Sequence, residues 1–192
     1  MRRRQGCPVR YFGSDILTIA DALTEAYVEI FTAPPWEHRG AAETAAAFRE
    51  RLEKDAHRPG FRALVSPADD GGVDGFVTGW TTRAPFPADR AYGRVTELLG
   101  PDRVDQLLVG ALEIDELGVR SRARGTGLGR RLLCALTAGA PEGRAWLLTW
   151  SQAHDTLAFY RRIGWREPAA RPGSETDVVV FLSPDPPDRN VG

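Results

Sequence analysis

The chain has 192 residues, of which 42% are hydrophobic and 27% are charged, a composition typical of a soluble globular protein with its own core. Its formal net charge of −1 excludes the global basic field that draws a protein to nucleic acid or to an anionic membrane. Two cysteines, Cys7 and Cys134, are too few for a disulfide framework or a zinc site, so we expect no metal. No apolar run approaches the roughly 20 residues that cross a bilayer, and no apolar segment follows the basic start, so we expect a cytoplasmic protein.

The first half of the chain predicts two helices followed by a hairpin. After a polar N-terminal stub, apolar residues recur at helical spacing between residues 16 and 30, and Ser14 or Asp15 can cap this helix. A second, Ala-rich helix is expected from about Ala42 to about Ala56. Two strand-like runs then flank the turn 69–72, which reads Asp-Asp-Gly-Gly, and this arrangement favours an antiparallel hairpin over residues 61–82.

The second half predicts alternating strands and helices. Residues 83–110 open with a Pro-containing loop and continue with a helical pattern that Gly100-Pro101 interrupts. Beyond it we expect a strand at 111–119, a helix at 128–138 with Cys134 as a small core residue, a strand at 145–150, a helix at 156–163 and a strand at 176–182. Such an order predicts a mixed sheet flanked by helices with one parallel crossover. We expect a single domain over 1–182 and a disordered, Pro- and Asp-rich tail at 183–192.

Three alternate glycines, Gly125, Gly127 and Gly129, lie between the strand that ends at Val119 and the helix that begins at Leu128. Glycines let the backbone curl so that successive N–H groups converge on an anion, and a helix N-terminus offers further unpaired N–H donors. The sequence therefore predicts a phosphate cradle, with cationic arms from Arg122, Arg124, Arg130 and Arg131. An ordinary Gly-rich turn that its arginines merely solvate is the alternative. The absence of a lysine after the glycines excludes a P-loop.

The segment Arg122 to Gly127 (Arg-Ala-Arg-Gly-Thr-Gly) fits the pattern Gln/Arg-x-x-Gly-x-Gly/Ala and thereby resembles the acetyl-CoA-binding motif of the GNAT superfamily of N-acetyltransferases. The register that starts at Arg124 fits as well. Downstream, Tyr160 followed four residues later by Gly164 and then Trp165 resembles the closing signature of that family. The joint resemblance covers about residues 111–165.

This resemblance implies an α/β fold: a GNAT-like mixed, mainly antiparallel sheet with flanking helices and a cofactor cleft between the parallel strands 111–119 and 145–150. It implies an acyltransferase that moves an acetyl group from acetyl-CoA to a primary amine of a small molecule or peptide. Dimerisation is common in the family, so a homodimer is one candidate assembly. A non-catalytic acyl-CoA-binding module is the alternative function. The segments 34–39 and 83–105 are expected to shape the acceptor pocket.

The resemblance also assigns site residues. In the family, the Gly-rich loop holds the diphosphate through backbone N–H groups and the preceding strand pairs with the pantetheine arm. The cofactor-binding residues implied here are Leu117, Gly118, Val119, Arg124, Gly125, Thr126, Gly127, Leu128, Gly129 and Arg130. Tyr160 is implied as the acid for the departing thiolate, with a plain core aromatic as the alternative. Glu113 is the candidate base, and Asp115 and Glu116 are its rivals. Ala153 stands where the family commonly carries Asn.

Overall fold

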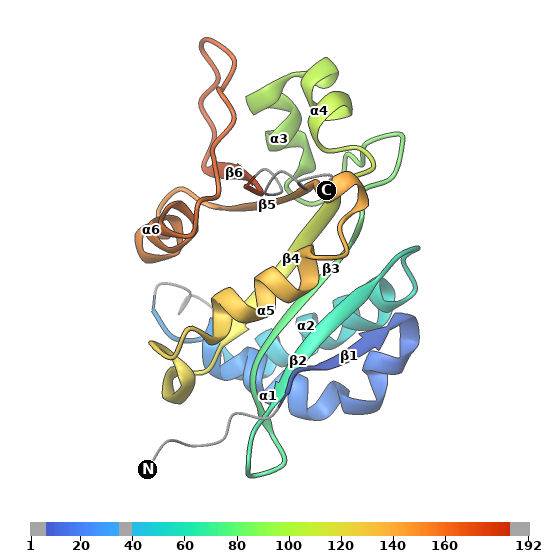
Figure 1. Cartoon of the computed structure of the whole chain (residues 1–192), viewed down its shortest axis with the longest axis vertical. Helices are drawn as coiled ribbons and strands as arrows, with labels where there is room; N and C mark the ends of the chain where they lie inside the picture. The colour runs from blue at the N-terminus through green and yellow to red at the C-terminus, as the bar shows by residue number, and fades with distance from the viewer. Residues whose placement is uncertain (1–6, 35–39, 185–192) are drawn as a thin grey trace, which may run out of the picture. The chain divides into compact units, whose positions relative to one another are not determined.

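The computed structural model describes residues 7–34 and 40–184, and these residues form two compact units that are described one at a time. Unit 1 comprises residues up to Trp80 together with Asp115–Leu136, and unit 2 comprises Thr81–Ile114 and the residues from Thr137 onward. Six strands form one sheet in the order β1-β2-β3-β4-β5-β6 (Figure 1). Within the described ranges, no helix is long and apolar enough to span a membrane.

Unit 1 contains three antiparallel strands, two long helices and the segment after β4. Its elements are β1 (Val9–Phe12), η1 (Gly13–Ile19), α1 (Ala20–Phe31), α2 (Ala41–Ala56), β2 (Arg62–Pro67), β3 (Val73–Thr81), the second half of β4 (Leu112–Val119), η2 (Ser121–Ala123) and α5 (Leu128–Thr137). The strands β1, β2 and β3 pair antiparallel, with Val65 opposite both Val9 and Phe76. The core of the unit includes Tyr27, whose ring stacks on that of Phe48 with 3.9 Å between the centroids. The predicted hairpin at 61–82 is confirmed.

Unit 2 contains two short helices, the first half of β4 and the two C-terminal strands. Its elements are α3 (Tyr92–Leu99), α4 (Pro101–Leu107), η3 (Pro141–Gly143), β5 (Ala145–Trp150), α6 (His154–Arg162) and β6 (Val178–Leu182). β4 pairs parallel with β5 from Leu112 to Ile114, and β5 pairs antiparallel with β6. The core centres on Trp146, which is fully buried and whose indole N–H donates to Thr82 Oγ1 at 2.7 Å. The mixed α/β sheet with a parallel β4–β5 pair and flanking helices is therefore confirmed.

Four local expectations differ from the structure. The N-terminal stub contains β1, a strand of four residues that its pairing with β2 holds in place and that carries too short an apolar pattern to be recognised. The first helix begins as the 3-10 helix η1, and α6 begins two residues earlier than expected. Cys134 is exposed, because the buried side of α5 is formed by Leu128, Leu132, Leu133 and Leu136. Residues 35–39, expected near the acceptor, and 185–192 of the tail lie outside the described ranges.

Candidate functional site

Residues 120–127, which we call the cradle loop, join β4 to α5 within unit 1. The loop turns through η2 and then through two glycines with left-handed backbone, Gly125 at φ +73° and Gly127 at φ +78°. The Thr126 hydroxyl donates to the carbonyl of Ala123 at 2.8 Å, which closes the turn between the glycines. Only glycine adopts such φ values without strain, so the predicted need for glycine at these two positions has a direct backbone cause.

The cradle loop leaves room for a ligand against its main chain. A Cβ atom built on Gly125 would meet nothing within 4 Å, and one on Gly127 would meet only a terminal nitrogen of Arg131, at 3.4 Å. The Arg131 N–H bonds to the carbonyl of Gly127 at 3.1 Å and starts the helical ladder of α5. The amides just before it belong to the first turn, where an α-helix has no partner for its N–H groups. This geometry fits a bound phosphate.

The strand that precedes the loop presents its backbone rather than its side chains at Gly118. A Cβ atom there would lie 2.9 Å from Cε1 of Phe76 and 3.0 Å from Cδ1 of Ile30, so the core of unit 1 excludes any side chain at this position. The parallel register with β5 ends at Ile114, and Leu117, Gly118 and Val119 lie further along β4. All the residues expected to bind the cofactor, 117–119 and 124–130, belong to unit 1.

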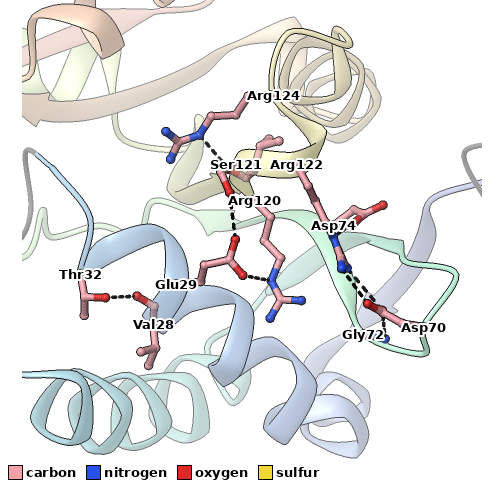
Figure 2. Close-up of polar contacts among 11 residues, drawn as sticks. Val28, Glu29, Thr32, Asp70, Gly72, Asp74, Arg120, Ser121, Arg122 and Arg124 are labelled. Carbon is pink, nitrogen blue, oxygen red and sulfur yellow. Dashed lines mark hydrogen bonds and ion pairs between the residues drawn. The ribbon is translucent and has the colours of Figure 1, made fainter.

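Arginines tie the cradle loop to its neighbours in unit 1 (Figure 2). Arg122 donates to Asp70 Oδ2 at 2.6 Å and to Asp74 Oδ1 at 2.8 Å, and so binds the loop to the β2–β3 hairpin. Nε of Arg120 lies 2.9 Å from Oε2 of Glu29 on α1, as an ion pair whose alignment falls short of a hydrogen bond. The Arg120 N–H also donates to the carbonyl of Asp74 at 2.9 Å. The expectation that Arg122 is a mobile cationic arm is wrong, because two carboxylates hold it.

The remaining arginines near the loop differ from one another. Arg131 donates through Nη1 to the carbonyl of Thr126 at 2.9 Å and thus supports the loop from α5. Arg124 donates through Nε to the carbonyl of Val119 at 3.2 Å. Among the described residues, neither Arg124 nor Arg130 has a carboxylate partner, and both side chains belong to exposed residues. Arg124 lies on the cradle loop and Arg130 on the first turn of α5.

Glu113 and Glu116, two of the three carboxylates of β4, have different surroundings. Glu113 is buried in unit 2 and accepts a hydrogen bond from the Tyr92 hydroxyl at 2.7 Å. Glu116 belongs to unit 1, where it accepts from Arg51 at 2.9 Å and from the Tyr27 hydroxyl at 3.3 Å. Burial, with the negative charge of Glu116, raises the pKa of Tyr27 above its ordinary value, so this hydroxyl stays protonated. The partners of these glutamates lie far away in sequence, so no local pattern predicts them: Tyr92, Arg51 and Tyr27.

A small hollow of about 10 Å³, room for about one water molecule and partly open to solvent, lies in unit 1 beside Glu116. Its apolar lining includes Phe48, Leu52 and Phe61, and its polar lining includes Arg51, Asp55, Asp115 and Glu116. Carboxylates outnumber guanidinium groups in this lining by three to one. Nε of Arg58 also donates to Oδ1 of Asp55 at 2.6 Å.

Tyr160 lies on α6 in unit 2 and is almost fully buried. Its ring packs against those of Phe159, Trp165 and Phe181, with centroids 5.2 to 5.9 Å apart. The main-chain N–H of Trp165 donates to the main-chain carbonyl of Tyr160 at 3.1 Å and closes the turn after α6. Ala153, at the start of α6, is buried and brings no polar group.

Comparison with known proteins places this geometry in a family. The model of the acetyltransferase (GNAT) family matches residues 20–165, which is most of the chain. The chain belongs to the GNAT acetyltransferase family. Such enzymes transfer acetyl groups from acetyl-CoA, so this GNAT chain is an acyltransferase. A search of curated proteins found no match.

Solved structures share the GNAT fold at low sequence identity. An acetyltransferase from Thermus thermophilus is 18% identical, with a TM-score of 0.55 over 92% of this chain and 95% of that one. The PaiA N-acetyltransferase from Thermoplasma acidophilum, solved in complex with coenzyme A, is 11% identical, with a TM-score of 0.59 over 93% and 99%. A protein from Corynebacterium glutamicum described as histone acetyltransferase HPA2 and related acetyltransferase is 19% identical, with a TM-score of 0.55 over 93% and 97%. At these identities the likeness establishes the fold.

Proposed function

We propose that this GNAT enzyme acetylates a primary amine of a small molecule or peptide with acetyl-CoA, and that the cradle loop and the start of α5 hold the diphosphate. The observation that carries the proposal is the pair of left-handed glycines, Gly125 and Gly127, with open space against their main chain at a helix start. Backbone N–H groups of Gly125 to Arg130 would donate to the phosphate oxygens. Arg124 and Arg130 would add positive charge.

Leu117, Gly118 and Val119 would orient the rest of the cofactor. The pantetheine arm contains amides, and the backbone of a strand offers the alternating donors and acceptors that such amides need. The lack of room for any side chain at Gly118 is consistent with a backbone role there. When bound, acetyl-CoA supplies a thioester whose carbonyl carbon an amine can attack. The N–H of Gly118 or Val119 would donate to the thioester oxygen.

Two buried side chains of unit 2 are proposed to move protons. Glu113 would accept a proton from the acceptor ammonium, and the Tyr92 hydroxyl, which donates to its Oε1 at 2.7 Å, would fix the orientation of the carboxylate. Tyr160 would donate its hydroxyl proton to the departing thiolate sulfur. Asp115 and Glu116 are rivals for the role of base, but the ion pair with Arg51 already engages Glu116.

The proposal is tested by incubating the enzyme with acetyl-CoA and each of a panel of amines and measuring the free thiol of coenzyme A that turnover releases. We expect turnover with at least one primary amine and none with its N-acetylated form as control. The alternative is a non-catalytic acyl-CoA-binding module, which the buried, apolar Ala153 in place of the usual Asn favours. Acetyl-CoA binding without turnover on any amine would support that alternative. If acetyl-CoA neither bound nor raised the melting temperature, both functions would be wrong.

A further inference from the structure

The arginines of the cradle loop divide into two kinds by their partners. Arg120 and Arg122 lie against three carboxylates, those of Glu29, Asp70 and Asp74. Their positive charge is therefore already neutralised within unit 1. Arg124 has no carboxylate partner among the described residues. The side chains of Arg122 and Arg124 extend in different directions from the loop (Figure 2).

The partners of Arg122 are themselves held in place. Asp70 lies in the turn between β2 and β3, and its Oδ1 accepts the N–H of Gly72 at 3.0 Å. The hydrogen bonds from Arg122 and Gly72 lower the pKa of Asp70 to about 2. Asp74 is the second residue of β3; its Oδ1 accepts from Nε of Arg122, and its main-chain carbonyl accepts from the N–H of Arg120. A side-chain contact and a main-chain contact thus fix the loop to the same hairpin.

We propose that Arg122 is a positioning residue, which with Asp70 and Asp74 forms a clamp that holds the cradle loop in its anion-binding shape, while Arg124 and Arg130 supply the charge that meets the phosphates. The inference rests on the proposed binding of acetyl-CoA by this loop. A loop that is ordered before binding loses less conformational entropy when the ligand arrives, so a clamp raises affinity without touching the ligand.

Breaking the clamp from either side tests this division of roles. Arg122→Ala removes the guanidinium, and Asp70→Asn with Asp74→Asn removes the opposing charges while keeping an oxygen for the Gly72 N–H. Calorimetry with coenzyme A measures the Kd of each folded variant at one salt concentration. We expect both changes to weaken binding, by about two- to fivefold, because exposed ion pairs are individually weak.

The test is decisive because direct contact between Arg122 and the phosphates would change the Kd of the two variants in opposite directions. If Arg122 instead met the phosphates, releasing it from the carboxylates would strengthen binding in the double variant while Arg122→Ala weakened it. That pair of results, or an unchanged Kd in both variants, would overturn the inference. Arg49→Ala breaks an exposed ion pair with Asp21 elsewhere in unit 1 and serves as the matched control, with unchanged Kd.

Salt dependence and amide exchange separate positioning from charge. Arg124→Ala and Arg130→Ala should flatten the rise of Kd with salt, because each removes an unscreened charge from the ligand. Arg122→Ala should keep the wild-type slope but speed amide hydrogen exchange at residues 123–127 in the free protein. A flattened slope in Arg122→Ala with unchanged exchange would contradict the clamp. Failure of the wild type to bind coenzyme A would instead refute the proposed function itself.

Discussion

The two units of this GNAT enzyme carry the two halves of the proposed chemistry in opposite ways. Unit 1 contains all the residues expected to bind acetyl-CoA, and its cradle loop is exposed and works through main-chain N–H groups. Unit 2 contains Glu113 and Tyr160, which are buried side chains among aromatic and apolar neighbours. A site built from main-chain N–H groups requires glycines at positions where a packed core does not, so it can be recognised in the sequence. A buried catalytic side chain has the same pattern as an ordinary core residue.

The largest expected effect would come from Glu113, the proposed base in unit 2. Glu113→Gln keeps an acceptor for the Tyr92 hydroxyl but cannot take a proton, so turnover at saturating substrates should fall by about 10³. Glu116→Gln should instead lower stability by about 1 kcal/mol, because it weakens a partly buried ion pair with Arg51, and leave turnover within about threefold. Turnover and melting temperature of both variants are the readouts. The reverse pattern would assign the base to Glu116.

Tyr160→Phe should lower turnover by about 10² while the melting temperature and the acetyl-CoA affinity stay near wild type. Only a hydroxyl is lost, so the ring contacts with Trp165 and Phe181 remain. Tyr11→Phe, on β1 in unit 1, makes the same chemical change outside the proposed site and should have no effect on turnover. Equal turnover in wild type and Tyr160→Phe would leave Tyr160 a core aromatic.

Gly127→Val tests the backbone site in unit 1. A β-branched side chain at φ +78° strains the loop and blocks close approach, so acetyl-CoA affinity should fall at least tenfold, about 1.4 kcal/mol. Gly173→Val is the matched control, because Gly173 has φ +77° and open space around a built Cβ but lies in unit 2 outside the cradle. Equal losses of affinity in the two folded variants would show that strain alone, and not ligand approach, is responsible.

The smallest expected effect concerns pH. The pKa of Asp70 is lowered to about 2 from 3.8, so the stability that its ionised form adds is present above pH 4 and is lost as the pH falls through about 2. The ratio of coenzyme A Kd values between Asp70→Asn and wild type should therefore be the same at pH 5 and pH 8. A ratio that approaches one at pH 5 would show that Asp70 titrates higher and that the clamp is weaker than described.

The same contrast explains what the sequence could predict. The β2–β3 hairpin, β5 and the start of α5 follow from turn residues and periodicity, and the structure confirms them. No local pattern predicts the strand β1, because it is four residues long and is held by partners on β2. The glycines predicted a cradle, but the pairing of Arg122 with Asp70 and Asp74 depends on a hairpin about 50 residues away in sequence. Roles that depend on distant partners leave no local spacing to detect.

Amide-proton NMR during a titration with coenzyme A tests the central claim most directly. If main-chain N–H groups of the cradle hold the diphosphate, the amide signals of Gly125, Gly127 and residues 128–130 should shift most and their exchange with solvent should slow. The matched glycine, Gly173, should not move. Saturable binding that left the amides of 125–130 unchanged, with the largest shifts elsewhere in the chain, would contradict the account.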